Sequence, residues 1–219
     1  MSALREFNIS MLEEYNSIAN NRELSSPLLI SSEQSYIDGL ERKIMYVGQE
    51  TNCWFNYGIS NSVVTAEDLE AAYFSFLKEG ARNREFWKFY KQILSINDEQ
   101  LIKNVIWTNT FIAGKRREMG APCISDSLLN ISLEYLLFVK DYFQPEHIIL
   151  VNGPTNPYYE LTIQFLKEIK SSLVTTYPTK SNPLVVDNQH NILWTYHPAF
   201  QNRIGIKEEV MSKIKSKLL

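Results

Sequence analysis

The sequence predicts a three-layer α/β/α sandwich around a central sheet of four parallel strands. The order of two kinds of segment along the chain leads to this fold class. Short apolar and β-branched runs alternate along the chain with stretches of helical periodicity. Strands that alternate with helices pair in parallel through right-handed crossovers, and the helices then cover both faces of the sheet. The four predicted strands are 43–47, 104–111, 147–152 and 191–196.

The amino-terminal region is expected to be a helical elaboration of about residues 1–40. Apolar residues recur there at helical spacing, namely Leu4, Phe7, Met11, Tyr15 and Ile18. An irregular segment at 25–35 is expected to follow, because its Ser-Ser-Pro and Ser-Ser-Glu triplets disfavour regular structure. No repeat or Pro/Gly-rich linker divides the sequence, so one domain spanning residues 1–219 is expected.

The other predicted helices lie between the strands and at the carboxyl terminus. Thr65, with Asp68 three residues later, predicts a capped helix start. Asn156 followed by Pro157 predicts another, because proline is tolerated at the first helical position. With these starts, the expected helices are 65–78, 84–94, 126–142, 156–169 and a charged one from about 205.

Composition and charge limit the function classes. The net charge of −3 argues against a dedicated high-affinity DNA binder, which is usually basic, but leaves room for a local basic patch. Cys53 and Cys123 are too few for a disulfide framework or a four-thiolate metal site. The leading hypothesis given below needs no metal or other cofactor. The apolar runs are strand-sized and the first residues lack a signal peptide's apolar core. A cytoplasmic monomer without membrane contact is expected.

Polar residues follow every predicted strand. Gly48-Gln49-Glu50 follows the first strand, Asn109 lies at the end of the second, and Asn152-Gly153-Pro154 follows the third. His197-Pro198 follows the fourth. Because ligands bind beyond the carboxyl ends of parallel strands, these residues are expected to meet at one edge of the sheet.

These segments, in this order, resemble the uracil-DNA glycosylase superfamily. Its members carry a Gly-Gln-Asp-Pro or Gly-Glu-x-Pro motif after the first strand and His-Pro-Ser after the last. This chain has Gly-Gln-Glu-Thr at 48–51 and His-Pro-Ala at 197–199. Between them, VIWTN (105–109) and IILVNGP (148–154) are similar to the family's second and third strands. The resemblance spans about residues 43–203.

The sequence also departs from the family pattern. Glu50 stands where an aspartate is usual, and Thr51 replaces the proline. Ala199-Phe200 replaces a serine-containing loop that wedges into the duplex, and the iron–sulfur cysteine set is missing. The first motif, GQETNCW, is similar to that of a divergent branch, so the fold transfers better than the activity.

The resemblance implies roles for individual residues. Glu50 would activate a water, and His197 would donate a hydrogen bond to the departing base. Asn109 would read the base edge, and Trp54 or Tyr57 would stack on it. The remaining expected substrate-binding residues are Gly48, Gln49, Asn52 and Pro198. Alternatives stay open: Glu50 as a turn or capping acid, His197 as a structural residue, Asn109 as a turn residue and the aromatic rings as core.

A basic run follows the second predicted strand. Lys115, Arg116 and Arg117 could hold DNA phosphates, with Arg203 as a further candidate, or could simply form a solvated loop. The leading hypothesis is a DNA glycosylase-like hydrolase that removes uracil or another damaged base from single- or double-stranded DNA, as in base-excision repair. The alternatives are a non-catalytic module that binds nucleobases, nucleic acid or protein, and a glycosidase of free nucleosides or nucleotides. No P-loop, dinucleotide fingerprint or nucleophile elbow is found.

Overall fold

The computed structural model describes the chain except residues 19–22, 52–53, 55–63, 82–83, 119 and 219. Its centre is a five-stranded sheet with the strand order β2-β1-β3-β5-β4. The parallel strands are β1 (Ile44–Gly48), β2 (Ile106–Asn109), β3 (His147–Leu150) and β5 (Ile192–Thr195). These four confirm the predicted strands, with bounds that differ from the predicted ones by up to two residues at each end.

The predicted strand count of four is wrong, because β4 (Leu184–Asp187) adds an antiparallel edge strand next to β5. A tight turn joins the two, and its backbone depends on Asp187. This carboxylate accepts hydrogen bonds from the backbone N–H groups of Gln189 (2.9 Å) and His190 (3.2 Å). Asn191 closes the turn with a positive φ of 52°. The sheet was predicted from strands that are separated by helices, and that pattern does not reveal two strands joined directly by a turn.

Each long predicted helix is present within a few residues of its expected bounds. These are α1 (Ala3–Ser17), α3 (Ala66–Lys78), α4 (Glu85–Leu94), α6 (Asp126–Phe143), α7 (Tyr158–Glu168) and α9 (Lys207–Leu218). Thr65 and Asp68 form the expected capping box of α3. Pro157 lies just outside α7 rather than at its first helical position. The shorter helices were not predicted: α2 (Gln34–Asp38), α5 (Asp98–Leu101), α8 (Pro198–Arg203) and the 3₁₀ turn Ser172–Thr175.

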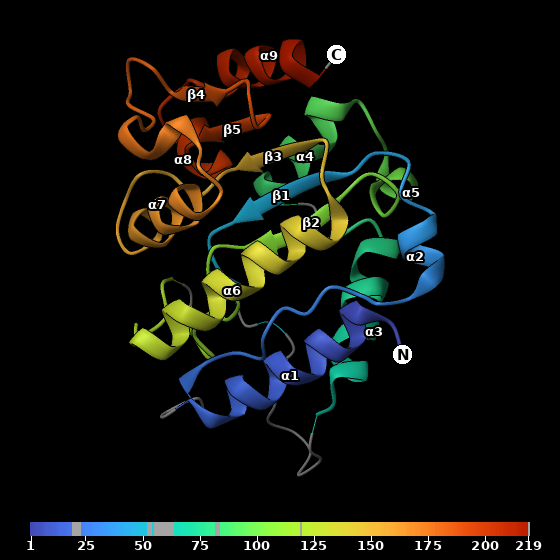
Figure 1. Ribbon diagram of the computed structural model, residues 1–219. Helices are drawn as coiled ribbons and strands as arrows, with labels where there is room; N and C mark the ends of the chain where they lie inside the picture. Colours follow the sequence, from blue (N-terminus) through green and yellow to red (C-terminus); the bar gives the residue numbers. More distant parts are fainter. Residues whose placement is uncertain (19–22, 52–53, 55–63, 82–83, 119, 219) are drawn as a thin grey trace.

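Helices cover both faces of the sheet, so the fold is an α/β sandwich. In Figure 1, α6 crosses in front of the strands and α4 lies behind them. α6 packs against α1 and α7, whereas α4 packs against α8 and α9. All five residues of β1 are buried, as expected for a parallel strand covered on both sides.

The amino-terminal segment contributes to the same core. Leu4 and Met11 of α1 are buried in the cluster that also contains the strands. The segment after α1 is irregular but not superficial, since Leu28, Leu29 and Ile30 are at most 1% exposed. It runs beside the chain that leaves β2, because the N–H of Leu28 donates to the carbonyl of Ile112 at 2.8 Å.

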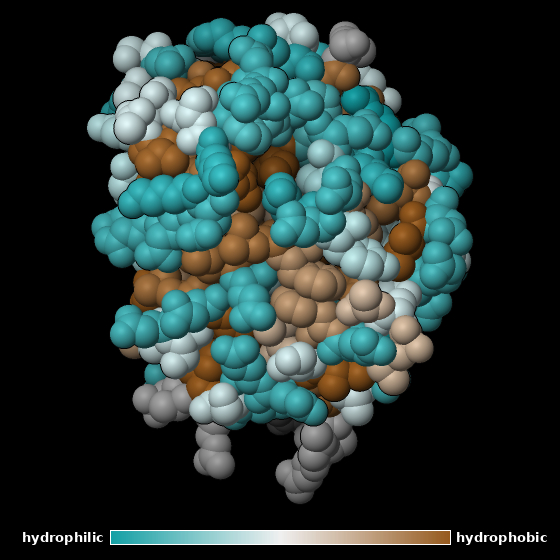
Figure 2. Space-filling model, viewed as in Figure 1, coloured by the Kyte–Doolittle hydropathy of each residue, from teal (hydrophilic) through white to brown (hydrophobic). Residues whose placement is uncertain are grey.

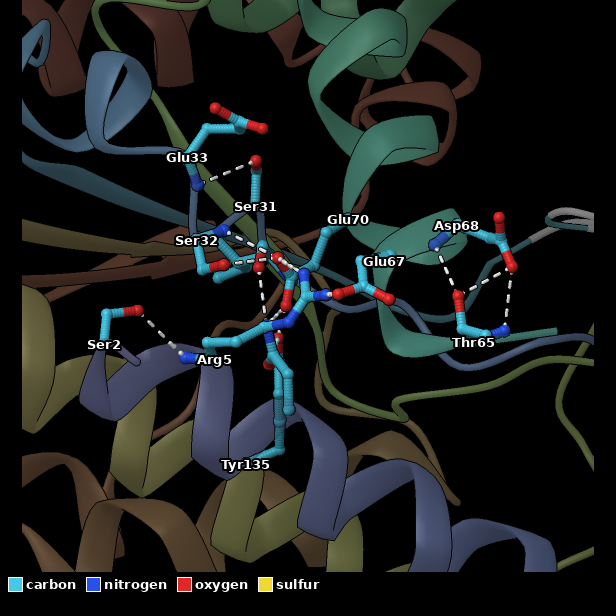
Figure 3. Close-up of polar contacts among 12 residues, drawn as sticks. Ser2, Arg5, Ser31, Ser32, Glu33, Thr65, Glu67, Asp68, Glu70 and Tyr135 are labelled. Carbon is cyan, nitrogen blue, oxygen red and sulfur yellow. Dashed lines mark hydrogen bonds and ion pairs between the residues drawn. The ribbon is translucent and has the colours of Figure 1, made fainter.

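A buried carboxylate joins α1, α3 and this segment (Figure 3). Glu70 of α3 is 3% exposed. It accepts hydrogen bonds from Arg5 Nη1 at 2.8 Å, Asn8 Nδ2 at 2.7 Å and the N–H of Ser32 at 3.2 Å. Arg5 also forms an ion pair with Glu67 on the exposed side. The charge of Glu70 is therefore neutralised and its oxygens are hydrogen-bonded, as a buried carboxylate requires.

The surface is mostly polar. Figure 2 shows hydrophilic residues over much of the viewed face, with hydrophobic atoms visible between them. Among the described residues, the large hydrophobic side chains classed as exposed are Met1, Ile124 and Tyr177. No helix in the described part of the chain has the length and apolar character needed to cross a membrane.

Candidate functional site

The ends of β1 and β2 lie against each other at the carboxyl edge of the sheet. Gly48 is paired with Asn109 in the parallel register. A Cβ atom on Gly48 would lie 2.4 Å from Asn109 Oδ1 and 2.9 Å from Cε2 of Phe86, the latter in α4. Glycine is therefore required here for close packing, and this packing brings Asn109 and Phe86 to the start of the Gly-Gln-Glu-Thr segment.

Glu50 lies two residues beyond β1 and is half-buried. Its carboxylate accepts hydrogen bonds from the hydroxyl of Tyr158, the first residue of α7, and from the backbone N–H of Gly120. Burial raises the pKa of Glu50 above its ordinary value, and the two hydrogen bonds partly oppose this rise. The carboxylate is thus oriented by two elements that are distant in sequence.

The backbone around Glu50 is held by the segment that follows β2. A Cβ atom on Gly114 would lie 2.1 Å from the carbonyl oxygen of Thr51 and 3.2 Å from Cγ of Glu50. Ser25 Oγ accepts a hydrogen bond from the N–H of Gly114 and lies 3.0 Å from Thr51 Oγ1. These contacts leave no room for a side chain at position 114 and fix the position of Glu50.

Gln49 and Asn152 connect the ends of the strands. Gln49 Nε2 donates to the carbonyl of Asn152 at 3.0 Å. The Asn152 amide donates to Thr110 and Thr162, both at 2.7 Å, and accepts from Trp194 Nε1 at 2.9 Å. Asn152 is 1% exposed with its amide satisfied in this way, so its role in the described structure is to hold the edge together.

His197 follows β5 and caps α8. Its Nδ1 accepts a hydrogen bond from the N–H of Ala199 at 3.2 Å, so the proton of the neutral ring is on Nε2. Burial lowers the pKa of His197 to about 4. The ring stacks on Phe86, with centroids 5.9 Å apart and an angle of 21° between the planes. His197 is therefore a neutral hydrogen-bond donor at neutral pH, and Phe86 links it to Gly48.

Asn109 is buried at 3% exposure. Its Oδ1 accepts a long hydrogen bond of 3.4 Å from Trp107 Nε1, and its Nδ2 has no partner in the described part of the chain. Buried polar groups are rarely left without partners in folded proteins. Asn109 therefore offers an unused donor at the end of β2.

The other predicted site residues that the structure describes lie in different environments: next to His197, within an aromatic cluster or on the surface. Pro198 is buried as the first residue of α8, next to His197. Trp54 packs edge-to-face against Phe76 and Trp107, within an aromatic cluster. Arg203 is exposed in the last turn of α8. Asn52 and Tyr57 lie outside the described residues.

Lys115, Arg116 and Arg117 directly follow Gly114, whose Cα lies against Thr51 and Glu50. An antiparallel bridge pairs Lys115 with Leu24. Together with Glu23, Glu118 and residues 121–123, the three cations line an open pocket of about 600 Å³.

Sequence reasoning did not find Tyr158, Phe86 or Gly114. Tyr158 could have been suspected, because the start of a helix that follows a parallel strand lies at the same edge as the strand's end. Phe86 gives no such signal, since it belongs to a run of aromatic residues in α4 that otherwise packs in the core. The role of Gly114 depends on a contact with Thr51 across the fold.

Comparison with known proteins adds no relative. No family model matches the chain, and no curated protein matches it. Among the described residues, no three His, Cys, Asp or Glu side chains are grouped so that they could hold a metal ion. The geometry of the carboxyl edge and the four motifs therefore form the basis for a functional proposal.

Proposed function

We propose that this protein is a DNA glycosylase-like hydrolase that cleaves the N-glycosidic bond of uracil or another damaged base in DNA. The observation that carries the proposal is a pair of half-buried titratable groups that follow β1 and β5 at one edge of the sheet. The pKa of Glu50 is raised and that of His197 is lowered, each by burial. Shifted pKa values of this kind in neighbouring loops are typical of catalytic groups.

Glu50 and His197 suit the two halves of such a reaction. Glu50 follows β1 and His197 follows β5, and only β3 lies between these two strands, which are therefore about 10 Å apart. In the proposal, the nucleoside lies between the carboxylate and the imidazole. Phe86 lies beside Gly48 and stacks on His197. It therefore packs against both the loop that follows β1 and the loop that follows β5.

In the proposed reaction, water adds to the anomeric carbon of the sugar as the bond to the base breaks. Ionised Glu50 takes the proton of that water and stabilises the positive charge that develops on the sugar. The electron pair of the broken bond leaves with the base, and Nε2–H of His197 donates a hydrogen bond to the resulting anion. Asn109 Nδ2 has no partner among the described residues but is buried, so it would donate to a carbonyl oxygen on the base edge only after the base displaces what covers it.

A strand-cleavage assay tests this function. Single- and double-stranded oligonucleotides that contain uracil, hypoxanthine or xanthine are incubated with the protein, treated with alkali and separated on a gel. We expect cleavage at one or more of these bases and none with the undamaged strand. Intact strands from a folded sample, together with base release from free nucleosides, would favour the nucleoside glycosidase. Binding without release from any substrate would favour the non-catalytic module.

The pH dependence of base release is expected to report on Glu50. Glu50 must be ionised to accept a proton, so kcat/KM should rise with pH through the raised pKa of this carboxyl. Tyr158→Phe removes a hydrogen bond that lowers this pKa. The pKa should then rise further, and the acidic limb of the profile should move to higher pH. His197, with a pKa of about 4, becomes protonated on the acidic side of the Glu50 titration and is neutral above it.

Tyr159→Phe is the matched control for this experiment. Tyr159 is the next residue of α7, and its ring stacks on Trp194, with centroids 6.1 Å apart, rather than contacting Glu50. This variant also loses one hydroxyl group, but the acidic limb of its kcat/KM profile should stay at the wild-type pH. Identical profiles for both variants and the wild type would show that Tyr158 does not tune the catalytic carboxyl.

A further inference from the structure

The pocket lined by residues 115–118 and 121–123, together with Glu23, is rich in charged side chains. It has a volume of about 600 Å³ and contains three cations and two carboxylates. One positive charge is therefore left over in a molecule whose net charge is −3. A local positive site in an acidic protein attracts anions to that site rather than to the surface at large.

Arg117 is the cation best placed to bind a ligand. Lys115 Nζ is 3.4 Å from Glu118, so its charge is partly neutralised. Arg117 is exposed, and no ion pair is found for it in the described residues. A guanidinium group can form two parallel hydrogen bonds to a phosphate, which makes arginine a preferred phosphate ligand.

The segment that lines the pocket also contains a hydrogen-bond donor to Glu50. Gly120, which donates its N–H to Glu50, lies between Glu118 and Ala121 of the lining. The floor is fixed by the Leu24–Lys115 bridge and by a hydrogen bond of 2.9 Å from the N–H of Arg116 to the carbonyl of Glu23. A ligand group in this pocket therefore lies next to the loop that orients the proposed catalytic carboxylate.

We propose that this pocket binds a phosphate group of the substrate, close to the nucleotide that is hydrolysed. The proposal rests on the function proposed above and adds the place where a phosphate of the substrate is bound, a contact that a free nucleoside cannot make. The phosphate belongs either to a nucleic-acid strand or to a single nucleotide. Both sources present phosphate oxygen atoms to Arg117. A phosphodiester in a strand carries one negative charge, and a monophosphate carries up to two.

Binding is measured without catalysis, so that this proposal can fail separately from the proposed function. The probes are a fluorescent, undamaged single strand of thymidines, thymidine 5′-monophosphate and thymidine, each titrated against the protein. Arg117→Gln should weaken binding of the strand about tenfold and reduce the slope of log affinity against log salt by about 0.7, the value for one lost phosphate contact. Glu118→Gln, which removes a carboxylate and frees Lys115, should strengthen it.

The matched control is Lys103→Gln. Lys103 lies before β2, at the opposite edge of the sheet, and its side chain is 54% exposed in an ion pair with Glu41. Its loss removes the same unit of charge and should leave binding unchanged. Tight binding of the monophosphate would identify a single nucleotide as the source, whereas binding of the strand alone would identify nucleic acid.

Two results would overturn the proposal. One is equal loss of strand binding in Arg117→Gln and Lys103→Gln, since this would show a response to net charge alone. The other is binding of thymidine as tightly as its monophosphate, since this would show that the phosphate makes no contact. Unfolding midpoints of the variants, compared with the wild type, identify a change in binding that comes from loss of structure.

Discussion

Glu50→Gln is expected to lower the turnover of base release about 10²–10⁴-fold, the range for loss of a general base. Glutamine keeps the shape of the side chain and can still accept a hydrogen bond from Tyr158, but it cannot take a proton from water. Affinity for a damaged strand, measured with the wild type at early times and with the variant at equilibrium, should change little. This separation between turnover and affinity distinguishes a chemical role from a binding role.

Glu146→Gln provides the control for this variant. Glu146 is exposed just before β3, at the amino end of the sheet, and loses the same charge on substitution. Its turnover should match that of the wild type. Equal losses of turnover and affinity in Glu50→Gln would contradict the assigned role, and so would unchanged turnover.

Glu70→Gln is expected to reduce the free energy of unfolding by about 3 kcal/mol, the lower end of the range for breaking a buried ion pair from one side. The substitution removes the negative charge beside Arg5 and turns an amide N–H₂ group toward donors on Asn8 and Ser32. Denaturation by urea, followed by tryptophan fluorescence, measures the change. The loss should appear as a lower midpoint with an unchanged slope.

Glu67→Gln tests whether burial is the cause. Glu67 pairs with the same arginine, but its side chain is 73% exposed, against 4% for Glu70. Exposed ion pairs contribute at most about 1 kcal/mol, so this variant should be nearly as stable as the wild type. Similar losses in the two variants would show that the network contributes through the charge of Arg5 alone.

Most of the sheet could be predicted from sequence because its parallel strands are buried on both faces. Residues 44–47 and 148–151 read as continuous apolar runs for this reason, and their ends could be aligned by the rule for parallel strands. β4 escaped prediction because its pairing with β5 depends on a turn whose geometry is set by the buried Asp187. Short helices such as α8 carry too few residues to show a period.

The site was less predictable than the fold. Gly48, Glu50, Asn109 and His197 could be placed at one edge from strand ends alone. The hydrogen bond from Tyr158 to Glu50 and the stacking of Phe86 on His197 join elements that are far apart in the chain. Sequence spacing carries no record of such contacts, so the partners that set the pKa values became visible only in three dimensions.

The strand order has a consequence for how the protein acquires its site during synthesis. β1 (44–48) is made about 140 residues before β5 (192–195), which pairs with β3 and is followed by His197. A nascent chain that stops before residue 192 has an unpaired edge on β3 and lacks the imidazole. Contacts between such distant segments slow folding. The carboxyl edge can therefore be completed only after the segment up to His197 has left the ribosome.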